Sequence, residues 1–264
     1  MKCLLPHRVV ALLLCAMLAS GCATSIPAAP KEERSPADPW EPMNRRISAF
    51  NNNVDRFSFK PLAKGYEAVV PPTMRRGINN FSKNLVSPLF IVNNFLQGKI
   101  RRGFSEIWRF TANTIWGIGG FVDVGADLGL ETYREDFGQT LAVWGVPDGP
   151  FVTVPILGPR TLRGATMIPL NFYADLGSSV SHVRTRRSLY VLRAIDARAQ
   201  LFTAETLLED SFDRYLTLRE SYLQNRVFLI FDGNPPEDED FYDEFYEDFE
   251  DDYEEEEEEQ DPPE

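Results

Sequence analysis

The residues Lys99–Asp123, KIRRGFSEIWRFTANTIWGIGGFVD, carry the clearest structural signal in the chain. Apolar residues recur at helical spacing over the first eighteen positions and form one stripe. Its members are Ile100, Phe104, Ile107, Trp108, Thr111 and Ile115. The spacing predicts a long helix over Lys99–Trp116. This helix runs into a turn that holds three glycines in four residues, Gly117, Gly119 and Gly120.

The glycine-rich turn is read in two ways, as a site of close helix packing or as a hinge. It resembles a phosphate-binding loop only superficially, because such a loop follows a strand and is followed by Lys and Ser or Thr. Here the turn follows a predicted helix and no such pair comes after it. Gly117, Gly119 and Gly120 are therefore candidate packing or hinge residues.

Helical signals continue on both sides of this stretch. Asp38 is the expected N-cap of a first helix, with Pro39 at the first helical position. Ser87 before Pro88 predicts a second N-cap, and Gly98 predicts a C-cap. Helical periodicity also runs through residues 188–202 and 208–222. The ordered chain is thus predicted to be mainly α-helical.

One segment departs from helical spacing. Leu141–Trp144 and Phe151–Pro155 are short β-prone runs on either side of a Pro-Asp-Gly-Pro turn. We expect a short hairpin or structured loop near residues 141–155. Pro155 and Pro159 argue against a regular sheet there.

The N-terminus has the pattern of an export signal. Lys2 and Arg8 precede an apolar run, and small residues lead up to Cys22. Residues 1–21 are predicted to be a lipoprotein signal peptide, after which Cys22 would carry diacylglycerol and an N-acyl group such as palmitate. Cys3 and Cys15 would be lost with the signal, so lipidation is the expected use of the remaining thiol. The alternative is an ordinary signal peptide with a chance cysteine.

Composition divides the rest of the chain. Residues 22–37 are rich in Ala, Pro and Ser and predict a flexible tether to the membrane. The folded domain is expected over 38–234. Nineteen of the 40 acidic residues fall within 237–264, so 235–264 is predicted to be a disordered acidic tail. Phe241, Phe245 and Phe249 leave open a helical stripe that forms on a partner.

The chain shows no pattern of an active site. His182 is the only histidine after the signal, no G-x-S-x-G elbow is present, and no spacing typical of zinc ligands occurs. We therefore expect no catalytic residues, no metal and no cofactor beyond the lipid on Cys22. Nucleic acid is not an expected partner of an exported protein of this charge, because the full chain carries a formal net charge of -13.

Several motifs in order resemble the MlaA (VacJ) family of outer-membrane phospholipid-trafficking lipoproteins. They are DPWEPMNR at 38–45, RGINNF at 76–81, NFLQG at 94–98, RFTANT at 109–114, GGFVD at 119–123 and DFGQTL at 136–141. The similarity spans roughly Asp38 to Phe231. The chain departs from the family at Asn52, where an aromatic residue is frequent, and at Arg160, where a small Ser is usual.

The resemblance implies an all-helical, ring-like lipoprotein at the periplasmic face of the outer membrane, embedded in the inner leaflet. It implies binding to a trimeric porin, a polar passage for phospholipids misplaced in the outer leaflet, and transfer to a periplasmic lipid-binding shuttle. The alternative is a structural lipoprotein that braces porins or the envelope and moves no lipid. Trp108 and Trp116 would lie either at the membrane interface or in the helical core.

The charged residues around the glycine-rich stretch are candidates for the passage, because charges that face lipid are costly. They are Asp123, Asp127, Glu131, Arg134 and Asp136. An ordinary solvated surface is the alternative for each. Arg184, Arg186 and Arg187 form a basic cluster that suits anionic lipid headgroups, a porin's acidic rim or plain solvent.

Overall fold

The computed structural model describes residues 37–209 and 211–235 of the 264. The predicted signal peptide, nearly all of the tether and nearly all of the acidic tail lie outside the described residues, and so does Cys22. Within the described part the chain is mainly helical, as predicted, with one two-stranded sheet.

The elements follow one another with short connections. In order they are α2 (Glu41–Val54), the π-helical turn η1 (Asp55–Phe59), α3 (Lys60–Val69), α4 (Pro72–Leu96), α5 (Ile100–Ile115), α6 (Val124–Asp127), α7 (Phe137–Val143), β1 (Phe151–Val154), β2 (Gly158–Thr161), α8 (Leu162–Thr166), α9 (Ile168–Ala174), the 3-10 turn η2 (Leu176–Ser179), α10 (Val183–Gln200), α11 (Phe202–Glu209) and α12 (Arg214–Ile230).

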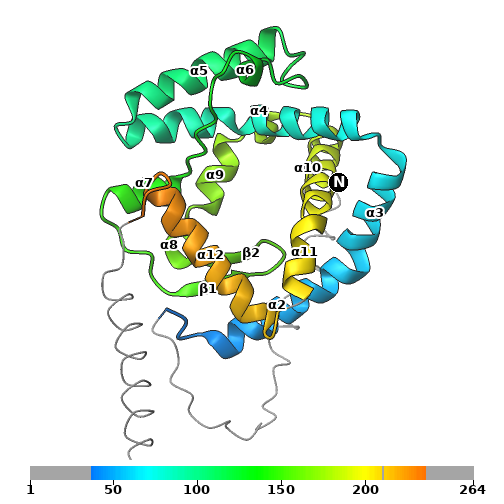
Figure 1. Cartoon of the computed structure of the whole chain (residues 1–264), viewed down its shortest axis with the longest axis vertical. Coiled ribbons are helices and arrows are strands. Elements are labelled where there is room, and N and C mark those ends of the chain that lie inside the picture. Colours follow the sequence, from blue (N-terminus) through cyan, green and yellow to red (C-terminus); the bar gives the residue numbers. More distant parts are fainter. Residues whose placement is uncertain (1–36, 210, 236–264) are drawn as a thin grey trace, which may run out of the picture. The chain divides into compact units, whose positions relative to one another are not determined.

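The helices of the described domain close into a ring (Figure 1). Starting from α2, the chain continues through η1 into α3, which packs on α10. Helix α10 packs on α4, α4 on α7, and α7 on α12. Helix α12 meets β2, and β1 returns to α2. Helix α5 packs along the outside of α4 and carries α6. The N-terminal and C-terminal helices therefore meet to complete the ring.

The prediction for the Lys99–Trp116 helix is confirmed by α5, whose bounds differ from it by one residue at each end. Gly98 lies just after the end of α4 with φ +75°, a conformation that favours glycine after a helix C-terminus. The tight turn at Gly98 brings α5 back antiparallel along α4. Their contact is the most extensive between any two helices of the described residues.

Two helix-start predictions are wrong. Helix α2 begins at Glu41, its N-cap is Trp40, and no side chain caps it. The Asp38 carboxylate instead lies in a buried network described below. Residues Ser87 and Pro88 fall inside α4, which runs through them without a break. A proline inside a helix costs about 3 kcal/mol, and here α4 is held on both sides of Pro88 by α5, α7 and α10.

The hairpin is present but lies later than residues 141–155. Strands β1 and β2 pair antiparallel, with Phe151 opposite Thr161 and Val154 opposite Gly158. The prediction of a β-prone run at Leu141–Trp144 is wrong, because these residues form the end of α7. Pro159 lies within β2, opposite Thr153, and is accommodated because a two-stranded sheet has only edge strands.

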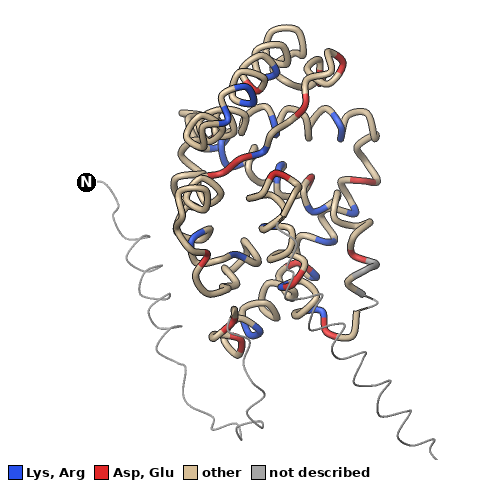
Figure 2. Tube along the Cα trace, turned by 60° about the vertical axis from the view of Figure 1, so that its left-hand side comes forward, with Lys and Arg blue, Asp and Glu red and all other residues tan. Residues whose placement is uncertain are grey.

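Burial in this domain runs against the pattern of an ordinary globular protein. Among the described residues six apolar side chains are buried, against nineteen polar or charged ones. Large apolar side chains are instead exposed on most helices. Figure 2 shows basic and acidic residues interspersed along the trace, not separated onto two sides. The buried side chains of the described residues are thus mostly polar, and many of the large apolar side chains are exposed.

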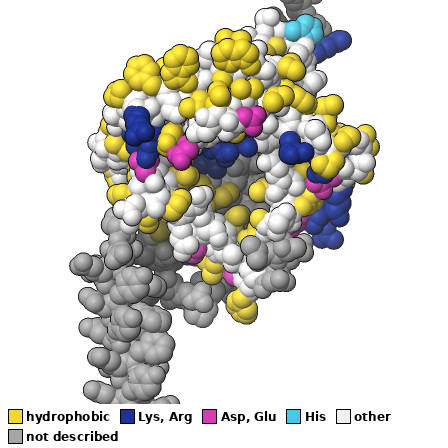
Figure 3. Space-filling model, turned by 45° about the horizontal axis from the view of Figure 1, so that its top comes forward, with side chains coloured by type: hydrophobic (Ala, Val, Ile, Leu, Met, Phe, Trp, Pro, Cys, Tyr) yellow, Lys and Arg dark blue, Asp and Glu magenta, His cyan; other side chains and the backbone are white. Residues whose placement is uncertain are grey.

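No helix of the described residues is both long enough and apolar enough to cross a bilayer. Figure 3 shows apolar side chains crowding one rim of the domain. It also shows a hollow in the middle of this face, with basic side chains in its wall.

Candidate functional site

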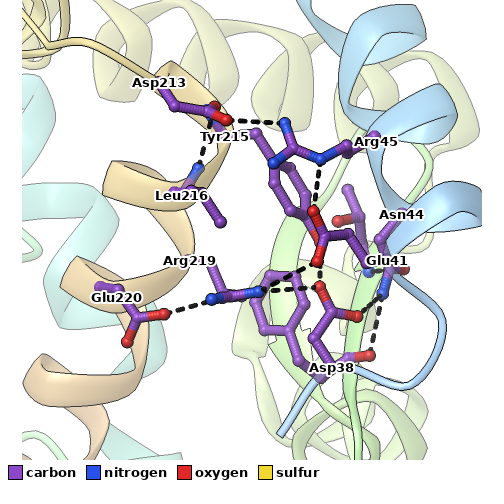
Figure 4. A network of polar contacts seen from close by, with 11 residues as sticks. Asp38, Glu41, Asn44, Arg45, Asp213, Tyr215, Leu216, Arg219 and Glu220 are labelled. Carbon is purple, nitrogen blue, oxygen red and sulfur yellow. Dashed lines mark hydrogen bonds and ion pairs between the residues drawn. The ribbon is translucent and has the colours of Figure 1, made fainter. Parts of the chain in front are cut away.

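The ring is closed by a buried carboxylate, Asp38, which is 0% exposed. It accepts hydrogen bonds from Asn44 Nδ2 at 2.8 Å, from the Tyr215 hydroxyl and from Arg219 Nη1 at 3.3 Å (Figure 4). Burial and the Asp38 hydrogen bond raise the pKa of Tyr215, so its hydroxyl remains a donor at neutral pH. One carboxylate therefore joins the start of α2 to α12.

The contact between α2 and α12 is the seam of the ring, and Asn44 extends it to the hairpin. Its Nδ2 also donates to the Phe151 carbonyl at 3.0 Å, and its Oδ1 accepts from the Thr153 N–H at 2.8 Å. Seven residues further on, Asn51 repeats the arrangement with the Val154 carbonyl and the Ile156 N–H. Two asparagines on one face of α2 thus pair with the hairpin's backbone as an additional strand would.

The opposite side of the ring is held by amides. Asn84 donates to Thr114 Oγ1 at 3.0 Å and to the Gly119 carbonyl at 3.1 Å, which joins α4 to α5 and its glycine turn. Asn93 accepts a hydrogen bond of 2.6 Å from the Thr140 hydroxyl on α7. These contacts give partners to the buried amide N–H groups of Asn84 and to Oδ1 of Asn93, as the burial of polar groups requires.

Between α6 and α7 the chain is extended and is pinned to α4 and α5. The Tyr133 N–H donates to Glu106 Oε1 at 2.5 Å, and the Tyr133 carbonyl accepts from Asn94 at 3.1 Å. Glu106 is fully buried, and this burial raises its pKa to about 7. Arg109 pairs with Asp123 at 2.5 Å.

A polar cavity of about 320 Å³ lies between α7, the hairpin, α8, α9 and α12. Its lining residues are Asp136, Leu157, Arg160, Gly164, Ile168, Asn171, Tyr222 and Arg226. Arg226 binds Asp136 through two hydrogen bonds of 2.7 Å each. Burial alone would raise the pKa of Asp136, but these two hydrogen bonds hold it below its usual range, so the pair is ionised.

The structure brings one of the five predicted passage residues to this cavity, namely Asp136. Asp123 caps α6 and pairs with Arg109. Asp127, Glu131 and Arg134 are exposed, and Glu131 accepts a hydrogen bond from the Tyr133 hydroxyl. Sequence reasoning did not select the other polar residues of the cavity, although Tyr222 and Arg226 are four apart on α12 and share a helix face.

The three glycines of the turn differ in their surroundings. A Cβ on Gly117 would lie 2.2 Å from the Val122 carbonyl oxygen, and one on Gly120 would lie 2.3 Å from Asn84. Gly120 also has φ +96°. Gly119 has φ +69° but meets nothing closer than 3.9 Å. Gly117 and Gly120 therefore occupy positions of close packing between the turn and the neighbouring α4 and α5.

The apolar stripe of α5 faces outward. Trp108 is 64% exposed and Trp116 is 66% exposed, which excludes the alternative that they pack in the helical core. Ile100, Phe104 and Ile115 on the same helix are also more than half exposed. The buried residues of α5 include Glu106 and Asn113, so this helix turns its polar side to the protein.

A family model described as MlaA lipoprotein matches residues 36–229, which is the described domain almost in full. The chain belongs to the MlaA lipoprotein family. The similarity expected from the sequence motifs is thus confirmed, and the buried polar networks described above belong to an MlaA-family domain.

Relatives from two bacteria support this membership. The intermembrane phospholipid transport system lipoprotein MlaA of Escherichia coli K12 is 37% identical over 232 residues, covering 86% of this chain and 90% of the relative. The protein of the same name in Haemophilus influenzae is 34% identical, covering 86% and 92%. A solved MlaA-like structure, from work on the maintenance of bacterial outer membrane lipid asymmetry, has 35% identity and a TM-score of 0.66. The match covers 73% of this chain and 98% of the chain in that structure.

Proposed function

We propose that this chain is the outer-membrane lipoprotein of an intermembrane phospholipid transport system. It removes mislocalised phospholipids from the outer leaflet through a polar passage and so maintains lipid asymmetry. The observation that carries this proposal is the reversed burial of the domain, whose buried side chains are mostly polar while many large apolar side chains are exposed. The names of the E. coli and H. influenzae relatives support the same function.

The reversed burial suits a protein that lies in one leaflet. An exposed apolar face is favourable when it meets acyl chains instead of water, and Trp108 and Trp116 suit the interface between chains and headgroups. A phospholipid that crosses the ring needs polar partners for its headgroup, and buried ionised groups need pairing. The interior supplies paired charges, such as Asp136 with Arg226.

The location and the partners form the finer part of the proposal. The lipid on Cys22 anchors the protein at the periplasmic face of the outer membrane, and the ring lies in the inner leaflet. A porin trimer binds beside it, and a periplasmic lipid-binding shuttle takes the phospholipid away. The protein carries out no chemical step on the lipid. These statements rest on the family resemblance and on the signal at Cys22.

The test is surface-exposed phosphatidylethanolamine, labelled with a membrane-impermeant amine reagent in cells that lack the gene. Restoring the gene is expected to lower the label to the parental level, and Cys22→Ser is expected to leave it high. An Ala23→Ser variant with unchanged lipidation serves as the matched control. Equal labelling with and without the normally expressed protein would contradict lipid transport. It would favour the alternative, a structural lipoprotein that braces porins or the envelope.

A further inference from the structure

The polar cavity beside α12 contains a cation, Arg160, that pairs with no carboxylate in the part of the chain that the structure describes. Asp136 and Arg226 neutralise each other within it. Arg160, from β2, donates one hydrogen bond to the neighbouring Pro159 carbonyl at 2.7 Å. Over residues 37–209 and 211–235 it forms no ion pair with a carboxylate. The titratable groups that line the cavity therefore sum to one positive charge.

Uncharged donors surround this cation. The Tyr222 hydroxyl lines the cavity and makes no hydrogen bond to any described residue. Asn171 uses its Oδ1 to accept from the Phe137 N–H at 3.2 Å, which leaves its amide N–H groups for another acceptor. An oxyanion that enters the cavity would thus find a guanidinium, a hydroxyl and an amide as donors.

Gly164 keeps the space between these donors open. A Cβ placed on it would lie 3.5 Å from the Tyr222 hydroxyl oxygen and 4.0 Å from Arg160 Cδ. The Tyr222 hydroxyl and the stem of Arg160 therefore lie near the same point, from α12 and from β2, and Thr161 Oγ1 lies 3.4 Å from it. Leu157 and Ile168 supply apolar wall on either side of the polar groups.

We propose that this cavity binds the phosphodiester group of a phospholipid, with the phosphate oxygens on Arg160, the Tyr222 hydroxyl and Asn171. The assignment rests on the proposed function, which brings phospholipid into the ring. A phosphodiester carries one negative charge and several acceptor oxygens, and arginine is well suited to pair with it. At about 320 Å³ the cavity takes a headgroup and the glycerol carbons next to it, while the acyl chains stay outside.

Asp136 contributes in a different way. Its Oδ2 accepts one hydrogen bond, from Arg226, and so keeps acceptor capacity on the cavity side of the pair. A headgroup that carries an ammonium would use this oxygen while its phosphate lies on Arg160. The Asp136–Arg226 pair also fixes α12 against α7, which holds Tyr222 in place.

The experiment is equilibrium binding of dihexanoyl phosphatidylethanolamine to the purified full-length lipoprotein in detergent. Inorganic phosphate and dihexanoylglycerol are the comparison ligands. Arg160→Ser is expected to weaken binding of the phospholipid about tenfold or more, because it removes the charged donor that pairs with the phosphate. Arg160→Lys should recover part of the affinity, and Tyr222→Phe should lose about threefold. Dihexanoylglycerol should bind no more tightly to the parent than to Arg160→Ser.

The matched control is Arg46→Ser, which removes an exposed cation of α2 that pairs with no described residue. It should bind like the parent. Wild-type affinity in both Arg160→Ser and Tyr222→Phe would overturn the proposal, and so would inorganic phosphate that binds as tightly as the phospholipid. Cooperative thermal unfolding of each variant shows that it is folded. Because binding is measured on purified protein, failure here is distinct from failure of the proposed function, which appears as unchanged surface labelling in cells.

Discussion

The two places where the ring is held together use different chemistry. At the seam between α2 and α12, a buried carboxylate collects an amide, a hydroxyl and a guanidinium. At the joint between α4 and α5, glycines allow close approach: a Cβ on Gly103 would lie 2.8 Å from the Phe95 ring. Amide hydrogen bonds from Asn84 complete that joint. The joint closes locally in sequence, whereas the seam closes over about 180 residues.

The difference follows from what each contact must achieve. Helices α4 and α5 are consecutive, so a tight turn at Gly98 positions them and small residues suffice to pack them. Residues 38 and 219 are distant in the chain, so the seam needs directional partners that accept one register only. Buried charge networks are well suited to specify a register, at a cost in desolvation.

The largest effect is expected from Asp38→Ala. This substitution removes the acceptor of the buried Tyr215 hydroxyl and one acceptor each of Arg219 and Asn44. Removal of one partner from a buried charged network costs about 3–5 kcal/mol. Chemical denaturation of the detergent-solubilised protein measures this change.

Asp127→Ala removes an exposed carboxylate from α6 and serves as its control, with a change below about 0.5 kcal/mol. Equal stability of the two variants would show that the ring does not depend on its seam. A selective loss in Asp38→Ala would confirm that the carboxylate closes it.

The second prediction concerns pH at the α5 side of the ring. Burial raises the pKa of Glu106 to about 7, so the folded state binds its proton more tightly than the unfolded state does. Its stabilising contribution is fully present below pH 4.5 and is lost as pH rises through 7. One pKa unit corresponds to about 1.4 kcal/mol, so the loss amounts to at most about 3 kcal/mol.

Glu106→Gln should therefore flatten the stability of the protein between pH 5 and pH 8 and stabilise it at pH 8. The seam behaves in the opposite sense. Asp213, the N-cap of α12, pairs at the seam with Arg45 of α2. Burial would raise the pKa of Asp213, but the Arg45 hydrogen bond lowers it, so its contribution is lost as pH falls through the lowered pKa. Denaturation midpoints at four pH values compare the two sides. A parent and Glu106→Gln with parallel pH profiles would contradict the assignment.

The third prediction separates crowding from backbone strain in the glycine turn. Gly120→Ala introduces a Cβ 2.3 Å from Asn84 at φ +96°, and overpacking of this kind costs about 1–3 kcal/mol. Gly119→Ala meets open space at φ +69°, so only the left-handed conformation is penalised, by about 1 kcal/mol. Thermal unfolding should rank the parent above Gly119→Ala and Gly119→Ala above Gly120→Ala. Equal midpoints for the two variants would mean that the α4–α5 joint yields to an added methyl group.

The sequence predicted the joint better than the seam. The period of Ile100, Phe104 and Ile115 set the bounds of α5, because a local pattern determines a local element. It did not reveal that this stripe faces outward, since periodicity identifies an apolar face without showing what covers it. The glycines of the turn were selected correctly as unusual, because glycines clustered after a helix indicate close packing or left-handed backbone.

The seam was misread because its partners are distant. Asp38 has the local pattern of an N-cap, and only contacts with α12 show that its carboxylate is used elsewhere. For the same reason, the sequence predicts only one of the two residues that form the ion pair in the cavity. Asp136 stood out beside apolar residues, whereas its partner Arg226 lies 90 residues away and nothing local joins them. Arg160 stood out in the sequence only as a departure from the family pattern.

The smallest effect is expected at the exposed rim of the seam. Arg45 pairs with Glu41 at 2.6 Å and with Asp213 at 2.8 Å, but its side chain is 39% exposed. Exposed ion pairs contribute about 0–1 kcal/mol and weaken as salt rises. Arg45→Gln should therefore lower stability by less than about 1 kcal/mol, and the loss should shrink in molar salt. Arg46→Gln, at the next residue of α2, removes a charge that pairs with no described residue and should change nothing at either salt concentration. If Arg45→Gln lowered the free energy of unfolding as much as Asp38→Ala does, the exposed ion pairs of Arg45 would stabilise the closed ring. A small, salt-sensitive loss would show that the buried Asp38 carboxylate stabilises it instead.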